Sequence, residues 1–328
     1  MRRNKDHLPE PYIDIIDNNE PNAYATKSGN KYFIGITSGA IVLIYDTFFR
    51  IMSSKKILTD VGDPSKGMEA KKTLNPTLTE LGQLTLPKEH HETSAPIDNT
   101  RILFAQQLIK MVFEFLIWHE FAHVIFGHVD YVHSVLGSFE IEEIEGEKEP
   151  HNWLDALVSQ TLEMEADGFA TNRGLDILDV LITNPDALTS ELRPYLNDWS
   201  SAIKMWVFAI YTFFRLFSNQ NNVRGIEKAS HPVPAVRSIL VLATVCTILQ
   251  PKNDAAFLER VSKICIDAAA AVEGAFEEIL QQKLDLTHFS FIMQEEASAH
   301  GHFLMKNRNA IIPLLQPFTY APLRPLST

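Results

Sequence analysis

The chain has 328 residues, of which 45% are apolar and 21% are charged, and its formal net charge at pH 7 is −12. This is the composition of an ordinary globular protein, with enough apolar residues for one large core or two. Because nucleic-acid-binding proteins concentrate lysine and arginine on one surface, the acidic balance argues against a nucleic-acid partner.

Residues 1–20 are polar and charged, and we expect them to lie on the surface or to fray. The basic residues near the start have no apolar segment behind them, so they do not form a secretory signal, and we expect a cytoplasmic location. The uncharged apolar runs of the chain are all shorter than the length of about 18 residues that a membrane span needs. We therefore expect no membrane span, whereas the oligomeric state is not indicated.

The first predicted elements are a β-hairpin and a helix. The hairpin consists of Asn22-Ala23-Tyr24-Ala25, a turn at Ser28-Gly29-Asn30 and a second strand over residues 31–37. Ser38-Gly39 then opens a helix over residues 40 to 52.

Residues 53–100 are rich in Lys, Thr, Pro, Gly and Ser, and their few apolar residues follow no helical or strand period. This pattern predicts an insertion of loops, which could form a flap beside a cleft. The insertion contains His90-His91, but adjacent side chains do not face the same way on regular structure, so we predict a solvated pair rather than a metal site.

A long apolar helix follows, beginning at Asp98 or Thr100 and continuing to about Gly127. It is apolar on nearly all sides, which indicates a buried helix. It contains an H-E-x-x-H motif, in which His119 and His123 share one face because they are four residues apart. The two histidines could clamp a zinc ion, and Glu120 could take a proton from a water on the metal. The motif therefore predicts hydrolysis, although so short a motif also arises by chance.

A second helix, predicted from Trp153 to about Arg173 and ended by Gly174, supplies a third ligand. Glu163 lies 40 residues beyond the second histidine, and two histidines with one glutamate are a recurrent ligand set of catalytic zinc. Asp167, one turn further on, could accept the free ring N–H of a ligating histidine. Glu165 lies two residues from Glu163 and is expected to face elsewhere.

Two neighbouring features have simpler interpretations. His128 would lie about 140° round a continuous helix from His123, so we predict a capping or hydrogen-bonded core residue rather than a ligand. Residues 140–150 are strongly acidic and are predicted to be a solvated loop. The alternative is that they disfavour acidic substrates or favour basic ones.

The rest of the chain is predicted to be helical. Helices are expected over 199–217, with an aromatic stripe typical of a core, over 234–249, and over 255–284. A proline-punctuated tail follows, and Cys246 and Cys265 are predicted to be buried, reduced thiols. We predict a metal-binding domain over 1–250 and a C-terminal extension over 251–328 that offers no chemistry and could brace the domain.

Four motifs together resemble the gluzincin metallopeptidases of the HtpX and CAAX-prenyl-protease type. That family has a strand with N-A-[FY]-A, then H-E-x-x-H, then E-[FY]-x-A-D, then H-P-x-x-x-x-R. The chain has them in the same order as Asn22-Ala23-Tyr24-Ala25, His119 to His123, Glu163 to Asp167, and His231-Pro232 with Arg237. It departs from the pattern at Met164, where an aromatic residue is usual, and in the long distance between the first strand and the histidines. The last ninety residues lie outside the match.

The resemblance implies an α+β, predominantly helical, zincin-like fold with a small N-terminal sheet beside the active-site helix. It implies one Zn²⁺ ion, a protein or peptide substrate, and an endopeptidase in which Glu120 is the general base. The family's other roles fall on His231 at the oxyanion, on Asp167 and Arg237 as orienting residues, and on Asn22 to Ala25. The last of these would be an edge strand that binds an extended substrate by strand addition, unless it is an ordinary sheet edge.

Two alternatives remain open. The order of Phe121-Ala122-His123, His128, Glu163 to Asp167 and Ser230-His231-Pro232 is also similar to that of bacterial phage-exclusion peptidases of the Lit type. This resemblance implies an effector that stays latent until a phage or partner signal arrives. The other alternative is a non-enzymatic protein with a structural zinc or a cleft that binds without cutting. The presence of Glu120 argues against this second alternative.

Overall fold

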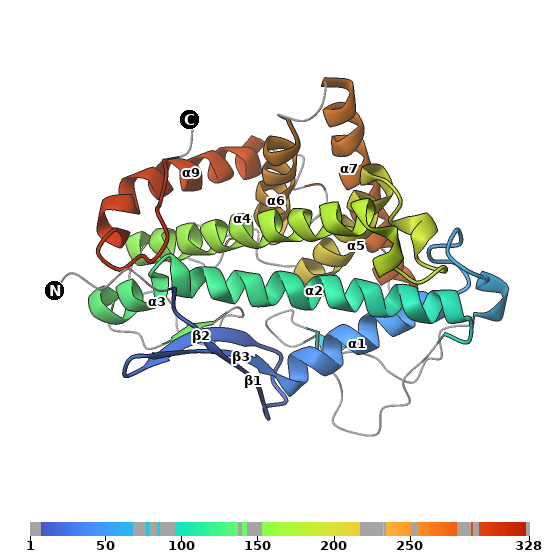
Figure 1. Cartoon of the computed structure of the whole chain (residues 1–328), viewed down its shortest axis with the longest axis horizontal. Coiled ribbons are helices and arrows are strands. Elements are labelled where there is room, and N and C mark those ends of the chain that lie inside the picture. The colour runs from blue at the N-terminus through green and yellow to red at the C-terminus, as the bar shows by residue number, and fades with distance from the viewer. Residues whose placement is uncertain are drawn as a thin grey trace.

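The computed structural model describes residues 8–67, 77–78, 84–85, 96–136, 140–142, 153–216, 232, 234–250, 255–280, 290 and 295–325. Long helices make up most of this part of the chain, and a small sheet lies beside one of them (Figure 1). The predicted class, a mainly helical chain with a small N-terminal sheet, is confirmed at this level.

The sheet has the strand order β1-β3-β2-β6. Its strands are β1 (Tyr12–Ile16), β2 (Ala23–Ser28), β3 (Lys31–Thr37) and β6 (Glu140–Glu142). Strands β2 and β3 form the predicted hairpin, with Gly29 at a φ of 60° in its turn. Strand β1 runs parallel to β3, and β6 runs antiparallel to β2.

Two of these strands correct the sequence-based predictions. Residues 12–16 lie largely on the surface, as expected, but they do not fray, because their β-branched and aromatic side chains favour an extended chain that pairs with the edge of β3. Residues 140–142, at the start of the acidic run, are not a solvated loop but a strand on β2. Ile141 anchors this strand by packing against the apolar side chains of Ala25 and Val124. Residues 143–150 lie outside the described part.

Helix α1 (Ser38–Ser53) follows the hairpin and is capped by the Thr37 hydroxyl, which accepts from the backbone N–H of Ala40. Beyond it, the insertion contains the short helix η1 (Pro64–Lys66) and a small ladder of β4 (Thr77–Leu78) and β5 (Leu84–Thr85). Its other residues between 68 and 95, including His90-His91, lie outside the described part.

The buried side chain of Arg101 orders the start of the insertion. Its three guanidinium nitrogens donate five hydrogen bonds of 2.7–3.0 Å to backbone carbonyl oxygens. The acceptors are Met52, Ser54, Ile57, Leu58 and Val61. A guanidinium group has five N–H donors, so this one is fully used, and residues 52–61 wrap around it.

The helices pack in layers around α2 (Asn99–Ile125), which begins after the N-cap Asp98 as predicted. In Figure 1 the sheet and α1 lie on one side of α2, and α4 (Trp153–Thr183) lies along its other side. Helices α6 (Pro234–Leu249) and α9 (Glu295–Leu315) pack against α4, and α7 (Ala255–Leu280) packs against α5 (Trp199–Leu216).

Two predicted helix boundaries are wrong. Helix α4 does not end at Gly174 but continues to Thr183. A Cβ on Gly174 would lie 2.7 Å from the indole Nε1 of Trp206, so the glycine allows α5 to approach closely and does not cap the helix. The expected proline-punctuated tail contains α9, and Pro313 lies near the end of this helix, where a kink disrupts little of it.

The main core lies between α1, α2, α5 and α7. The ring of Phe115 on α2 contacts Trp206, Phe213 and Phe214 on α5, which confirms that the aromatic stripe is core. Cys265 is a buried free thiol and Cys246 a half-buried one. Among the described helices, none combines the length and the apolar character that a bilayer crossing needs.

Candidate metal centre

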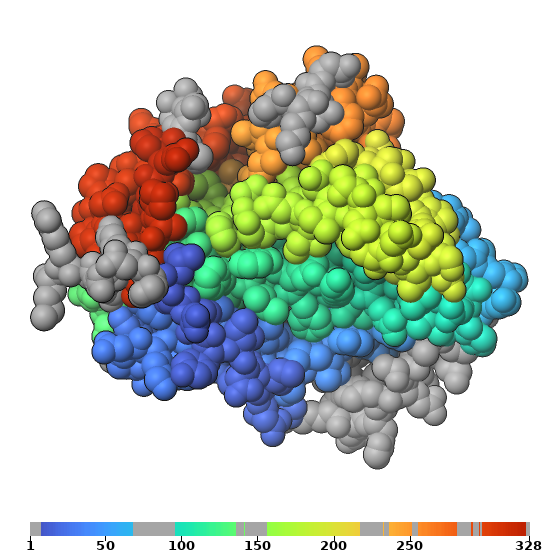
Figure 2. Space-filling model, in the orientation of Figure 1, coloured from blue at the N-terminus to red at the C-terminus, as the bar shows by residue number. Residues whose placement is uncertain are grey.

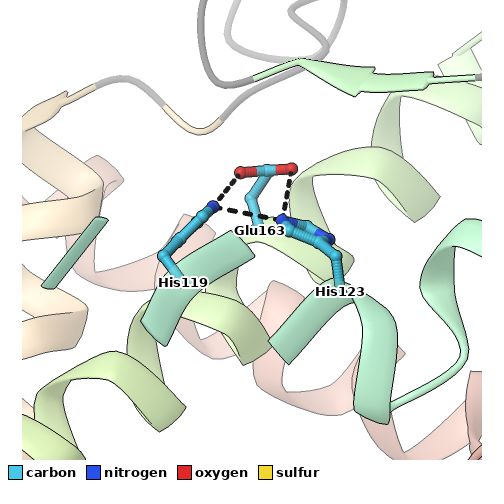
Figure 3. A group of neighbouring side chains, drawn as sticks. All are labelled: His119, His123 and Glu163. Carbon is cyan, nitrogen blue, oxygen red and sulfur yellow. Dashed lines mark hydrogen bonds and ion pairs between the residues drawn. The ribbon is translucent and has the colours of Figure 1, made fainter. Parts of the chain in front are cut away.

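The three predicted ligands come together where α2 and α4 lie side by side. His119 and His123 project from α2, and the Glu163 carboxylate on α4 lies across from both rings (Figure 3). The His119 Nε2 atom is 3.1 Å from Glu163 Oε2 and 3.1 Å from His123 Nε2, and His123 Nε2 is 3.4 Å from Glu163 Oε1. All three side chains are buried.

This geometry suits a metal ion. Ligand atoms placed tetrahedrally at about 2.0–2.1 Å from zinc are separated from one another by about 3.3 Å. The three separations here are 3.1–3.4 Å, and the ligand atoms all lie within 4.8 Å of one another. Two histidines and one carboxylate therefore lie close enough together to hold a metal ion.

The outer ring nitrogen of His119, which is the one that faces away from the other two ligands, contacts a carboxylate, as predicted. Its Nδ1 is 2.9 Å from Asp167 Oδ1, one helical turn beyond Glu163. Arg237 on α6 donates from Nε to Asp167 Oδ2 at 2.8 Å and from Nη2 to Oδ1 at 2.7 Å. Because a carboxylate only accepts, Nδ1 of His119 carries the proton, and its Nε2 directs a lone pair at the other ligands. The guanidinium of Arg237 also lies 4.5 Å from the ring centroid of Phe214.

The outer nitrogen of His123 is held by a longer chain of contacts. His128 Nδ1 is 3.1 Å from His123 Nδ1, and His128 Nε2 is 3.2 Å from Glu165 Oε2. Arg308 on α9 donates to Glu165 Oε1 from Nε at 3.0 Å and from Nη2 at 2.6 Å. Burial raises the pKa of Glu165, but the hydrogen bond from His128 and the charge of Arg308 hold this pKa below its ordinary value.

The sequence-based argument placed His128 wrongly, although its expected role as a hydrogen-bonded core residue is confirmed. Helix α2 ends at Ile125, and Gly127 adopts a φ of 76°, so His128 opens a separate short helix, α3 (His128–Tyr131). The turn brings its ring back against His123 instead of placing it 140° away. A glycine just before a histidine was the signal that could have indicated this turn. Nothing near Arg308 in the sequence indicated its contact.

Glu120 is buried on α2 beside His119, at the position that the motif requires. Glu165 faces away from Glu163, as predicted, but its carboxylate belongs to the same site through His128. His231 lies outside the described residues, whereas Pro232 after it is buried.

The predicted substrate strand is not an open edge over half of its length. Strand β2 pairs with β6 at Tyr24, Ala25 and Thr26, and Ala23 and Ala25 are buried. The backbone N–H of Asn22 donates to the Thr37 hydroxyl at 2.8 Å. The prediction of a free edge over residues 22–25 is therefore wrong where β6 covers β2, and any role in substrate binding stays a prediction.

Comparisons with known proteins found no matching family model, no matching curated protein and no matching solved structure. The resemblance to gluzincin peptidases therefore rests on the motifs alone.

Proposed function

We propose that this chain is a zinc metalloendopeptidase whose ligands are His119, His123 and Glu163. The observation that carries the proposal is the direction in which the lone pair on the His119 Nε2 atom points. Asp167 fixes the proton of His119 on Nδ1, so Nε2 faces a carboxylate and a second imidazole at 3.1 Å with its lone pair. Such a cluster inside a protein is unfavourable unless a cation or a proton lies within it.

The charge around the ligands supports a divalent cation. The described buried charges here are the carboxylates of Glu120, Glu163, Glu165 and Asp167 and the guanidinium groups of Arg237 and Arg308. Four negative and two positive groups leave a formal charge of −2, which one divalent ion neutralises. The ligand set of two imidazoles and one carboxylate favours zinc over magnesium or calcium, which prefer all-oxygen sites.

The roles of the residues follow from their positions. A zinc ion at this site would supply Lewis acidity towards a peptide carbonyl and towards water. Glu120 would accept a proton from the attacking water at a carboxylate oxygen and deliver it to the amine nitrogen of the leaving peptide. Asp167 and Arg237 would hold His119 in the tautomer whose Nε2 lone pair can bind the metal. The family's oxyanion role would fall to His231.

The test compares new protein N-termini in a cell lysate treated with the purified wild type or with Glu120→Gln. Glu114→Gln on the same helix is the matched control, because it makes the same chemical change away from the motif. We expect cuts from the wild type and from Glu114→Gln, none from Glu120→Gln, and one zinc ion per chain in all three proteins. Cuts that persist in Glu120→Gln would contradict the proposed mechanism.

A latent peptidase of the phage-exclusion type is a second candidate, and the position of β6 favours it. This strand pairs with β2 where the resembled family would bind its substrate. Cutting of ordinary lysate proteins by the purified chain would contradict latency. A chain that carries one zinc ion but produces no wild-type-specific cuts would instead favour a latent enzyme or a structural, non-enzymatic zinc site.

A further inference from the structure

Three buried side chains in a row connect His123, the second proposed zinc ligand, to helix α9. Starting from His123, the row consists of His128 on α3, Glu165 on α4 and Arg308 on α9. We propose that His128, Glu165 and Arg308 form a positioning relay that holds His123 in its metal-binding form, so that α9 is a working part of the metal centre. This inference rests on the metal centre proposed above.

The direction of the hydrogen bonds carries the argument. The Glu165 carboxylate only accepts, so His128 Nε2 is the donor in the contact of 3.2 Å between them. With His128 neutral, its single N–H lies on Nε2, so its Nδ1 accepts and the donor at 3.1 Å is Nδ1 of His123. His123 therefore has its lone pair on Nε2, the atom that faces His119 and Glu163.

Arg308 fixes the orientation of the Glu165 carboxylate in this row of hydrogen bonds. Its Nε and Nη2 donate to the same oxygen, Oε1 of Glu165, which leaves Oε2 for His128, and its Nη1 donates to the backbone carbonyl of Arg324. Without Arg308, the buried carboxylate would lose its ionic partner and the contact that sets its rotamer. The relay thus does for His123 what Arg237 and Asp167 do for His119, but it uses one more residue.

Neighbouring contacts hold Arg308 in place. On the same helix, His300 Nε2 lies 2.7 Å from Gln160 Oε1, and Asn307 donates to the Thr161 hydroxyl at 2.8 Å. Gln160 and Thr161 are buried on α4, one turn or less before Glu163. Figure 2 shows the C-terminal segment, in red, packed beside the green and teal segments that include α2 and α4. Helix α9 is therefore fixed against the helix that carries the third ligand.

The test measures zinc affinity of the full-length chain by competition with a chromophoric chelator. We expect Glu165→Gln and Arg308→Gln to weaken zinc binding ten- to hundredfold, the range for residues that orient metal ligands. Arg308→Lys keeps the charge and should recover most of the affinity. Arg215→Gln is the matched control, because Arg215 is a similarly buried partner of a carboxylate, Glu273 on α7, which lies outside the row from His123 to Arg308.

A double-mutant cycle and the exchange of the His123 ring proton separate positioning from general stability. In a His128→Leu background, Arg308→Gln should cause no further loss of zinc affinity, because its route to His123 is already broken. In zinc-bound protein, ¹H–¹⁵N correlation spectra of the histidine rings should show the His123 proton on Nδ1, protected from exchange with water by its hydrogen bond to His128. Glu165→Gln and Arg308→Gln should make this proton exchange faster.

The outcomes distinguish the relay from the metal centre itself. A wild-type chain that takes up no zinc overturns the metal centre and the relay with it. Zinc binding by the wild type with unchanged affinity in the folded variants overturns the relay alone. An equal loss in Arg215→Gln, or additive losses in the His128→Leu background, would also overturn it, because the effect would then be one of general stability.

Discussion

Arg101 is the residue whose contacts differ most from the usual pattern for a buried charge. Its guanidinium is fully buried, yet all five of its hydrogen bonds go to backbone carbonyl oxygens rather than to a carboxylate. Burial lowers the pKa of Arg101 from its ordinary value, although Asp98 and Asp60 partly offset this. The Leu58 carbonyl also accepts from the backbone N–H of Val61 at 3.0 Å, whereas Arg101 is the described donor to the carbonyl groups of Met52, Ser54, Ile57 and Val61.

We expect Arg101→Lys to lower the free energy of unfolding by about 3 kcal/mol. A lysine reaches at most two or three of the five oxygens, and each buried carbonyl left without a donor costs about 1 kcal/mol or more. Urea unfolding measures the change. Arg173→Lys, at an exposed pair with Asp176, should cost less than about 1 kcal/mol. A loss below 1 kcal/mol in Arg101→Lys would show that residues 52–61 are held by other contacts.

The residues of the metal centre differ in how far the sequence could predict them. Two pairs could be predicted from spacing alone. His119 and His123 are four residues apart on α2, and Glu163 and Asp167 are four residues apart on α4, so the helical period places each pair on one face. His128 could not be placed in this way, because its position depends on the left-handed Gly127 between two helices. The contact of Arg308 with Glu165 joins residues 143 positions apart and follows from packing alone.

At the level of helices and strands, Gly174 shows most clearly why a sequence-based prediction failed. A glycine after a helical pattern normally indicates a helix end, but α4 continues through this one to Thr183. The reason lies in α5, where the fully buried Trp206 packs directly on the glycine backbone. The short strand β6 was missed for a related reason, since three residues show no period and depend on the neighbouring β2 for their structure.

This contact predicts opposite effects for two glycine-to-alanine changes in helices. Gly174→Ala should lower the free energy of unfolding by about 1–3 kcal/mol, because the new methyl group would lie 2.7 Å from Trp206 Nε1. Gly274→Ala on α7 meets no atom within 4 Å and should raise stability by about 0.5–1 kcal/mol through helix propensity alone. Chemical unfolding of both variants measures the difference. Stabilisation of both by a similar amount would mean that α4 and α5 do not pack this closely.

At the scale of the whole molecule, the metal centre connects parts of the chain that the sequence assigned to separate regions. Arg237 on α6 and Arg308 on α9 each hold a carboxylate of α4. On the other side of α2, Asp130 on α3 accepts from Tyr32 of β3 and from Lys27 of β2 at 2.6 Å. The described C-terminal helix thus contributes a charge to the site, although the C-terminal extension was expected to offer no chemistry.

Zinc should therefore stabilise regions far from its ligands. An ion that binds the folded chain at a free concentration 1,000 times its dissociation constant adds about 4 kcal/mol to stability. We expect zinc to slow amide hydrogen exchange in α9 and α3 as well as in α2 and α4, and a chelator to reverse the effect. Helix α1, which has no described contact with the ligands, is the internal reference.

The variant Arg308→Gln makes this prediction specific to the relay. With Arg308 removed, zinc at saturating concentration should still protect α2 and α4, which carry the ligands, but should protect α9 less than in the wild type. The physical reason is that α9 would keep its packing on α4 and lose its ionic connection to His123. Equal protection of α9 in both proteins would mean that zinc acts on α9 through the packing of α4 alone, without any contribution from the charged row that ends at Arg308.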